Sequence, residues 1–308
     1  MKPTNRWASV LPLVVMLMIV LGMAPAMAQE AVGVEKLTGT LKKIRDTKSV
    51  VIGYRDASVP FSYLNPARRP IGYSIDLCLV IVEDIRGELG DDTIQVKYVP
   101  VNPQNRIPMV VSNAVDLECG STTNNAERQK QVAFSPIIFV AGTKLMVKRG
   151  APYNSYRDLK GRSVVATEGT TNEAAIKSLN VKEHLEINLV LVRDHDQAFA
   201  TLQAGKADAW ANDDVLLYAA KTEAKDPDDF VILPEYLSYD PYGIMYRKND
   251  PLFDALVKHS FQNLAETREL ARIYEQWFLR PLPSGRRLGL EMSPQLASIF
   301  ESMGQATE

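Results

Sequence analysis

Two passages of this chain repeat one pattern of helix, turn and strand, and this repeat constrains the fold more than any other feature. The passages are NRIPMVVSNAVDLECGS (residues 105–121) and DQAFATLQAGKADAWAN (residues 196–212). In each passage an amphipathic helix stops at Asn or Gly, and a short strand then begins with Asp flanked by small or apolar residues. The repeat predicts two units of related architecture.

Each passage closes a longer alternation of strands and helices. The first series has predicted strands at 48–54, 94–99 and around Leu117, with helices at 74–89 and 104–113. The second series has predicted strands at 163–167, 187–192 and 207–211, with helices at 171–179 and 194–204. Two β-α-β-α-β series predict an α/β fold of two lobes, each with a mostly parallel sheet flanked by helices.

The last part of the chain is predicted to return to the first lobe. A strand at 242–247 and helices at 250–264 and 266–278 need a sheet to pack on. Two crossings near residues 140 and 240 then form a two-stranded hinge, which favours closure of the lobes over free tumbling. Beyond residue 281 the composition predicts a surface tail. The predicted boundaries are 29–140 plus 241–280 for lobe 1, 141–240 for lobe 2 and 281–308 for the C-terminal tail.

The N-terminus has the order of a secretory signal peptide. Two basic residues, Lys2 and Arg6, precede an apolar run at 10–24, and the triplet AMA at 26–28 forms a cleavage site. The apolar run is short for a membrane-spanning helix, which needs about 20 residues. We therefore expect residues 1–28 to be removed and the mature protein to be soluble and periplasmic. No Cys follows the cleavage site, so a lipid anchor is not expected.

Composition argues against two classes of partner. Residues 1–28 hold two of the chain's 35 Lys and Arg and none of its 37 Asp and Glu, so cleavage leaves 33 basic and 37 acidic residues, a net charge of −4. Nucleic-acid binding usually needs a basic stripe, and no nucleic acid is expected. The chain holds three His and two Cys, and no metal is expected.

The two cysteines, Cys78 and Cys119, are either paired or separate. Thiols of exported proteins often form disulfides. The distance between two residues does not follow from sequence, so a disulfide and two independent buried thiols both remain open.

Polar and charged residues gather near the loops after the predicted strands, where open α/β sheets bind ligands. The candidate ligand-binding residues are Arg55, Arg106, Ser121, Thr123, Arg128, Thr170, Thr171, His195 and Asp213. A carboxylate is bound by a guanidinium fork with hydroxyls and backbone N–H groups beside it, and an ammonium needs a carboxylate such as that of Asp213. The set suits a zwitterionic amino acid, with Arg55, Arg106 and His195 as surplus positive groups for an acidic side chain.

Most of the candidates also have a structural explanation without a ligand. Arg128 lies in the charged stretch AERQKQ and could belong to a solvated helix face. The Ser and Thr residues could cap helices. Arg55 could pair with Asp56, His195 could be a half-exposed helix residue, and Asp213 could cap the following helix. The residues taken singly leave these alternatives open.

Six stretches in a fixed order carry a family resemblance. They are GYRDASVPFSY (53–63), QNRIP (104–108), ECGSTTNNAERQKQVAFS (118–135), DLKGRSVVATEGTTNE (158–173), NDD (212–214) and YGIMYRKND (242–250). The chain resembles, from about residue 40 to residue 300, the periplasmic solute-binding proteins of polar amino acid ABC transporters (bacterial solute-binding protein family 3). Within that family it is most similar to the glutamate/aspartate-binding branch. The resemblance implies the two-lobe periplasmic binding protein fold.

The resemblance also implies roles for the candidate residues. Arg128 would clamp the ligand α-carboxylate, assisted by Ser121, Thr123, Thr170 and Thr171. Asp213 would take the α-ammonium, and the side-chain carboxylate would face Arg55, Arg106 and His195. The chain departs from the branch at Asn102-Pro103, where a Thr-Ser pair is usual. Proline offers neither a hydroxyl nor an N–H, so one donor to the ligand side chain is lost.

Together these features indicate a substrate-binding subunit that captures glutamate or aspartate by hinge closure and delivers it to an inner-membrane ABC permease. We expect a monomer without cofactor or catalysis. One rival is a secreted enzyme on the same fold, resembling cyclohexadienyl dehydratase, with His195 or Glu168 as its acid or base. The chain lacks the G-x-S-x-G and H-E-x-x-H motifs of common hydrolases. A second rival, a sensor ectodomain, would need a further membrane segment or a signalling module.

Overall fold

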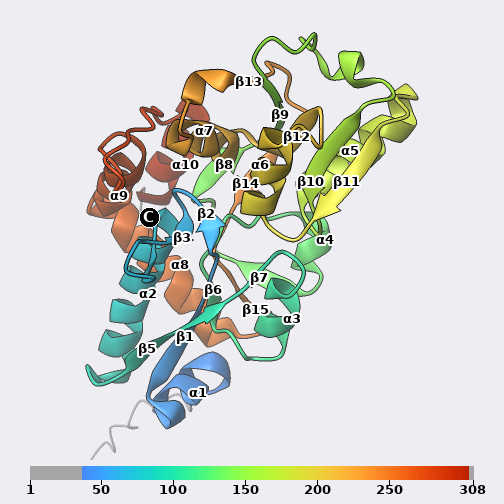
Figure 1. Cartoon of the computed structure of the whole chain (residues 1–308). Coiled ribbons are helices and arrows are strands. Elements are labelled where there is room, and N and C mark those ends of the chain that lie inside the picture. The colour runs from blue at the N-terminus through green and yellow to red at the C-terminus, as the bar shows by residue number, and fades with distance from the viewer. Residues whose placement is uncertain (1–36, 305–308) are drawn as a thin grey trace, which may run out of the picture. The chain divides into compact units, whose positions relative to one another are not determined.

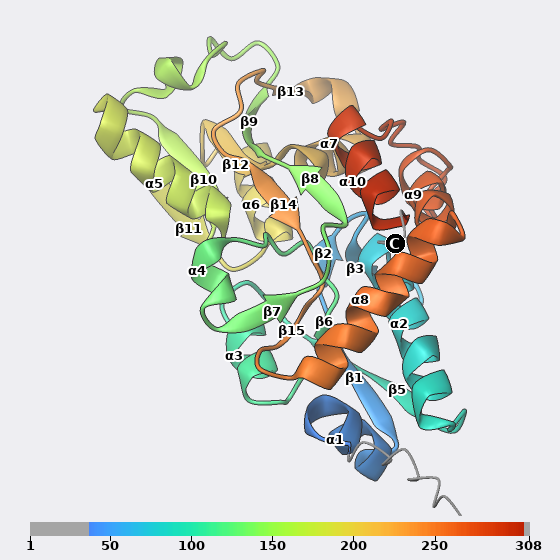
Figure 2. The ribbon, with the colours of Figure 1, turned by 180° about the vertical axis from the view of Figure 1, so that it is seen from behind.

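The computed structural model describes residues 37–304, and Figures 1 and 2 show it from opposite sides. The predicted signal peptide at 1–28 lies outside the described residues. Within residues 37–304 no helix is long and apolar enough to cross a membrane. The fold of the described residues is built on two five-stranded sheets.

The first series of strands and helices forms part of the first sheet. The strands of this sheet are β1 (Ser49–Tyr54), β5 (Gln95–Pro100), β6 (Leu117–Glu118), β7 (Val132–Phe134) and β15 (Met245–Arg247), and the crossover helices are α2 (Tyr73–Leu89) and α3 (Arg106–Val111). β1 pairs in parallel with β5 and β6, because a helix returns the chain to the same end each time. β15 and β7 add antiparallel pairs, which gives the order β5-β1-β6-β15-β7. We call the part of the chain built on this sheet the first lobe.

The second series forms a sheet with the same arrangement. Its strands are β9 (Thr143–Lys148), β10 (Ser163–Thr167), β11 (Asn188–Val192), β12 (Ala209–Asp213) and β13 (Phe230–Ile232), and its helices are α5 (Thr171–Glu183), α6 (His195–Gln203) and α7 (Asp214–Glu223). β10 pairs in parallel with β11 and β12, and β9 pairs antiparallel with both β12 and β13, in the order β11-β10-β12-β9-β13. The two repeated passages thus occupy equivalent places. In each sheet four strands run in the same direction, and one strand, β15 in the first sheet and β9 in the second, runs the opposite way. We call the part built on this sheet the second lobe.

Two short paired strands connect the lobes. β8 (Phe139–Ala141) leads into the second lobe, and β14 (Asp240–Tyr242) leads back. They pair antiparallel from Asp240–Ala141 to Tyr242–Phe139, and Figure 2 shows them side by side between the two sheets. The predicted single strand at 242–247 is therefore divided between the hinge and the first sheet. The α/β fold with two lobes and a two-stranded hinge is confirmed.

The chain then completes the first lobe. After β15, α8 (Pro251–Glu266) and α9 (Glu269–Phe278) pack against α2. The remaining elements before residue 281 are α1 (Gly39–Thr47), β2 (Ala57–Ser58), β3 (Ser62–Leu64), β4 (Pro70–Ile71), α4 (Ala126–Gln129), and the short 3-10 helices η1 (Tyr156–Leu159) and η2 (Pro227–Asp229). β2, β3 and β4 form a small antiparallel sheet.

Alternating side chains place a core on each face of the second sheet. In β12, Ala209 and Ala211 pack on one face and Trp210 packs on the other, as the two-residue period of a strand requires. Ile176 of α5 covers the first of these faces and Leu202 of α6 covers the second. The sheet that carries half of the candidate site is therefore held rigidly from both sides.

An aromatic cluster supports the hinge from the first lobe. The Phe61 ring is fully buried, and its centroid lies 5.1 Å from those of Phe139 in β8 and Tyr242 in β14. Phe278 of α9 lies 5.6 Å from Phe61. Such edge-to-face contacts stabilise the fold beyond what the burial of apolar area alone provides. Phe61 is therefore a core residue of the first lobe.

The segment after residue 281, predicted as a surface tail, folds back in part onto the first lobe. α10 (Pro294–Gly304) packs on α8, and its Leu296 and Phe300 join the first lobe's core. These apolar residues lie four apart and so share one helix face. The same segment contacts the second lobe, because Ser284 Oγ donates a hydrogen bond to Glu223 Oε1 over 2.6 Å.

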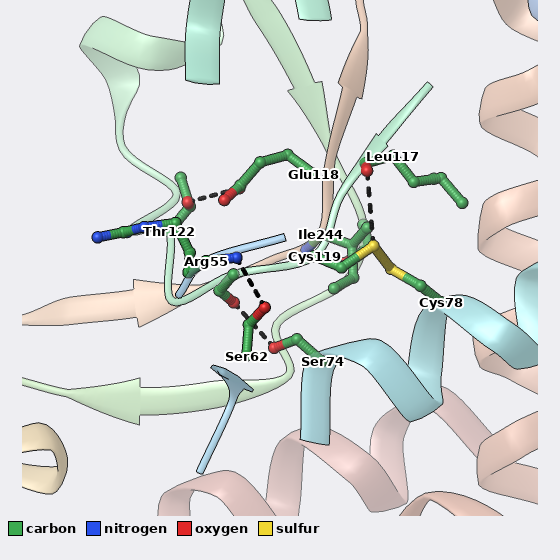
Figure 3. Close-up of a disulfide and its surroundings, with 11 residues drawn as sticks. Arg55, Ser62, Ser74, Cys78, Leu117, Glu118, Cys119, Thr122 and Ile244 are labelled. Atoms are coloured by element: carbon green, nitrogen blue, oxygen red, sulfur yellow. Dashed lines mark hydrogen bonds between the residues drawn. A yellow bond between two sulfur atoms is a disulfide. The ribbon is translucent and has the colours of Figure 1, made fainter. Parts of the chain in front are cut away.

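A disulfide joins α2 to the end of β6. Cys78 and Cys119 are bonded, with 6.4 Å between their Cα atoms and a sequence separation of 41 residues. Figure 3 shows the bond beside the loop that follows β6. Ser74, on the same helix, donates a hydrogen bond to the Gly120 carbonyl over 2.8 Å. The loop at 119–123 is thus fixed to α2 at two points.

Candidate ligand-binding site

The candidate residues come from loops and helix starts of both lobes that face the hinge. Arg55 follows β1, Arg106 begins α3, Ser121 and Thr123 follow β6, and Arg128 lies in α4. In the second lobe, Thr170 and Thr171 begin α5, His195 begins α6 and Asp213 ends β12. Except for Arg128, which lies in α4 shortly before β7, these positions lie at the carboxyl ends of strands or in the loops and helix starts that follow them, as expected for open α/β sheets.

Direct contacts between the lobes bring part of this set together. Thr123 Oγ1 lies 3.2 Å from Thr171 Oγ1. The Tyr242 hydroxyl donates a hydrogen bond to Asp213 Oδ2. The backbone of Thr123 pairs with that of Tyr242, so the hinge strand β14 holds the loop that bears Thr123. Residues of the first lobe, the second lobe and the hinge therefore meet at one place.

Three arginine side chains are buried in the first lobe's half of the site. Arg55, Arg106 and Arg128 have exposed fractions of 4%, 2% and 8%. Burial, followed by the nearby charge of Arg106, lowers the pKa of Arg55 to about 10 and that of Arg128 to about 9. Burial also lowers the pKa of Arg106. The arginines remain cationic at neutral pH, so the site concentrates positive charge in a region that water barely reaches.

Arg128 does not belong to a solvated helix face. Its backbone N–H donates a hydrogen bond over 2.9 Å to Oδ1 of Asn125, the N-cap residue of α4. Its side chain turns inward, and Nη1 donates a hydrogen bond to the Thr123 carbonyl over 2.8 Å. One donor is thus used to hold the guanidinium, and the rest of its fork can serve a ligand carboxylate.

Asp213 precedes α7 without capping it through its side chain. Its Oδ1 accepts from Asn172 Nδ2 over 2.8 Å, and its Oδ2 accepts from Tyr242. Burial and the neighbouring Asp240 raise the pKa of Asp213 to about 7. A buried carboxylate of this kind is a suitable partner for an ammonium group, which would lower its pKa again.

The two threonines at the start of α5 have different tasks. Thr170 Oγ1 donates to the Thr167 carbonyl over 2.6 Å and accepts from the Glu173 N–H over 3.2 Å, so Thr170 is a helix N-cap. The Thr171 hydroxyl instead faces Thr123 across the lobes. The capping role considered for Thr170 is thus present in the structure, and Thr171 presents its hydroxyl to the site.

His195 is a neutral group in this setting. Its side chain is buried, and Nδ1 lies 3.0 Å from Thr167 Oγ1. Burial, then the charges of Arg55 and Arg106, holds the pKa of His195 well below its ordinary value. The sequence suggested His195 as a positive group for a ligand carboxylate. Because burial and the two nearby guanidinium groups both oppose its protonation, the imidazole is neutral in the ligand-free protein and can act as a hydrogen-bond partner.

The departure at Asn102-Pro103 lies where the two lobes meet. Asn102 Oδ1 accepts from the N–H groups of Gln104 and Asn105 over 3.0 and 2.9 Å, so this oxygen is used to start α3. A Cβ on Gly169, which has a φ of +77°, would lie 3.3 Å from the Pro103 carbonyl group. Pro103 therefore packs against the turn before α5.

Cavities border the site. One of about 430 Å³ reaches Arg55 and Asn102, and one of about 380 Å³ reaches Thr123 and Thr171. A third, of about 220 Å³, reaches His195. Four of the candidate residues, Arg55, Thr123, Thr171 and His195, therefore adjoin space that a small molecule could fill or approach through.

Four residues near the site did not emerge from the sequence. Thr122 accepts a hydrogen bond from Arg106, and the charge of Glu118 acts on the same arginine. Asn172 and Tyr242 donate hydrogen bonds to Asp213. Glu118 and Thr122 lie inside the stretch ECGSTT, and Asn172 follows Thr171 directly. The sequence shows that these residues lie in or beside the family motifs, but it does not show which side chains they contact.

Comparison with known proteins identifies the family. The family model for bacterial extracellular solute-binding proteins, family 3, matches residues 50–280. The chain belongs to this family.

Relatives of this family 3 protein share most of its length. It is 43% identical to the L-glutamate/L-aspartate-binding protein of Pseudomonas aeruginosa over 279 residues, which cover 90% of this chain and 92% of the relative. It is 38% identical to the glutamate/aspartate import solute-binding protein of Salmonella typhimurium, covering 92% and 95% of the two chains. Among solved structures, a mutant of ArgBP from T. maritima matches with a TM-score of 0.69 at 26% identity, covering 78% of this chain and 99% of that one.

Proposed function

We propose that this family 3 protein is the extracytoplasmic substrate-binding subunit of an amino acid ABC transporter, with glutamate or aspartate as its ligand. The observation that carries the proposal is the burial of three guanidinium groups, those of Arg55, Arg106 and Arg128, beside an inter-lobe contact. Buried positive charge that neighbouring carboxylates offset only in part is costly, and an amino acid with two carboxylates would offset the remainder. The names of the two relatives support the same ligands.

Within this proposal the ligand contacts follow the charges of the site. Arg128 would bind the α-carboxylate together with Ser121, Thr123, Thr171 and the backbone at Thr170. Asp213 would bind the α-ammonium. Arg55 and Arg106 would face the side-chain carboxylate, and His195 would contribute a hydrogen bond. We propose the lobe boundaries 29–140 plus 241–280 and 141–240 as the bodies that move.

Closure supplies the transport signal. The ligand would bind the first lobe through the arginines and then engage Thr171 and Asp213 of the second lobe, so it favours the closed form by its higher affinity for that form. An inner-membrane permease would recognise the closed shape. Export by the N-terminal segment would place the protein, as a monomer, in the periplasm.

The proposal is tested by calorimetry on the mature chain, refolded from denaturant to remove bound ligand, with each of the twenty L-amino acids. Saturable binding of glutamate or aspartate is expected, with a micromolar or tighter Kd, about −8 kcal/mol or better. Binding confined to neutral or basic amino acids would refute the proposed ligand. Conversion of a prephenate-like compound by the same preparation would favour the enzyme instead.

A further inference from the structure

A buried carboxylate lies among the three arginines and has no part in the ligand contacts proposed above. Glu118 ends β6, in the middle of the first sheet, with an exposed fraction of 0%. Its Oε2 accepts a hydrogen bond from Thr122 Oγ1 over 2.6 Å, which Figure 3 shows. Its Oε1 is buried and has no hydrogen-bond partner among residues 37–304.

Thr122 connects this carboxylate to Arg106. Arg106 Nη1 donates to Thr122 Oγ1 over 2.6 Å, and the hydroxyl hydrogen of Thr122 is then directed to Glu118. Nε of Arg106 is buried and without a partner in the described part of the chain. The Glu118 carboxylate therefore fixes the direction of the Thr122 hydroxyl, and the Thr122 hydroxyl in turn fixes the position of the Arg106 guanidinium.

The charge of Glu118 acts on all three arginines. It raises the pKa of Arg55, Arg106 and Arg128, against burial. The loop is shaped to keep the carboxylate close: a Cβ on Gly120 would lie 2.4 Å from Glu118 Oε1 and 2.9 Å from Arg55 Cγ. The carboxylate therefore offsets part of the positive charge that a ligand would meet.

A purely structural ion pair does not explain this residue. Within residues 37–304, Glu118 is not one of the acids that lie within 4.0 Å of a basic nitrogen. A buried charge stabilises a fold poorly unless it is closely paired and fully hydrogen-bonded. Glu118 meets neither condition, and the hydrogen bond to its Oε2 connects it through Thr122 to Arg106.

We propose that Glu118 is a positioning and specificity-determining residue that orients Arg106 through Thr122 and offsets one positive charge of the site. This inference rests on the proposed function. The hydrogen-bond acceptor orients Arg106 toward the side-chain carboxylate of the ligand. The negative charge reduces the attraction for that carboxylate, so the ligand is held reversibly and can be released to the permease.

Glu118→Gln separates the two effects, because glutamine keeps an acceptor for Thr122 and removes the charge. Kd values for glutamate and glutamine are measured by displacement calorimetry, with gluconate in place of chloride so that no small anion fills the site. Loss of a repelling charge should tighten glutamate binding about fivefold or more and leave glutamine binding nearly unchanged. An unchanged or reduced preference for glutamate over glutamine would overturn the role of the charge.

Thr122→Val and Thr122→Ser test the relay with matched variants. Valine removes the hydroxyl, so glutamate affinity should fall about tenfold with a smaller loss for glutamine, while serine should restore the wild-type ratio. Equal losses for both ligands, or no rescue by serine, would overturn the positioning role. If Glu118→Gln does not fold, this pair decides the inference. Failure of the wild-type protein to bind glutamate at all would instead refute the proposed function.

Discussion

The Tyr242 hydroxyl donates a hydrogen bond to Asp213 Oδ2, which joins the hinge to the carboxylate proposed to bind the ligand ammonium. Tyr242 ends β14, one of the two strands between the lobes, and its backbone also pairs with Thr123. A movement of this strand therefore displaces groups on both sides of the site. In the proposed function, Tyr242 would therefore couple ligand binding to hinge closure.

The first prediction concerns that bond. Tyr242→Phe removes a hydrogen bond that lowers the pKa of Asp213, so a larger fraction of the carboxyl is protonated at pH 7. We expect glutamate affinity at pH 7 to fall about tenfold. Calorimetry at about pH 8.5 should show a smaller loss, because Asp213 is then ionised in both proteins. An equal loss at both pH values would mean that Tyr242 acts through packing instead.

The second prediction concerns the pH dependence of the wild-type protein. The ligand-free Asp213 has a pKa of about 7, raised from 3.8 by burial and Asp240, and its protonated form cannot pair with an ammonium. Glutamate affinity should therefore rise between about pH 6 and pH 8, with proton release on binding at pH 7. Calorimetry in two buffers of different ionisation enthalpy measures that release.

The same pKa has a consequence for stability. A carboxyl whose pKa is higher in the folded than in the unfolded state makes the folded state bind more protons. This group should therefore lower the stability of the ligand-free protein as the pH rises from about 4 to 7.

Asp240→Asn removes a negative charge that raises the pKa of Asp213, so the pH profile of glutamate binding should shift to lower pH. A profile that is flat, or that falls with pH, would contradict the proposed role of Asp213.

The third prediction concerns Arg128. Arg128→Ala should reduce the affinity for every amino acid ligand about 100-fold or more, because the α-carboxylate is common to all of them. The melting temperature without ligand should change little, since burial and the charge of Arg106 already oppose the charged guanidinium. Arg128→Lys keeps the charge without the fork and should recover part of the affinity. Loss limited to acidic ligands would place Arg128 at the side chain instead.

The fourth prediction concerns Arg55. Arg55→Gln should weaken glutamate binding about 10- to 100-fold and leave glutamine binding nearly unchanged. The side-chain carboxylate is the group that Arg55 is proposed to face. Displacement calorimetry with the two ligands measures the ratio directly. Similar losses for both would remove Arg55 from the side-chain subsite.

Local patterns in the sequence located most elements of the fold. The pattern that predicted a helix ending at Gly90 corresponds to α2, whose C-cap Gly90 has a φ of 58° and donates to the carbonyls of Arg86 and Gly87. The predicted strand at 242–247 is divided, because β14 pairs with β8 and β15 pairs with β6 and β7. Such pairing depends on residues about 100 positions away, which no local pattern contains.

In the candidate site, too, the features that depend on local sequence were predictable and those that depend on tertiary contacts were not. Loops after strands can be read from sequence, so Arg55, Thr171 and Asp213 were all found as candidates. The neutral state of His195 depends on its burial near two guanidinium groups, and the bond between Tyr242 and Asp213 depends on the course of the hinge. These relationships arise from tertiary packing and need the folded chain.

The most direct test of the central claim is a crystal structure of the mature chain grown with L-glutamate. We predict one glutamate between the lobes, with its α-carboxylate on Arg128, its ammonium on Asp213 and its side-chain carboxylate facing Arg55 and Arg106. A glutamate bound elsewhere, or one whose side chain points away from Arg55 and Arg106, would contradict the account.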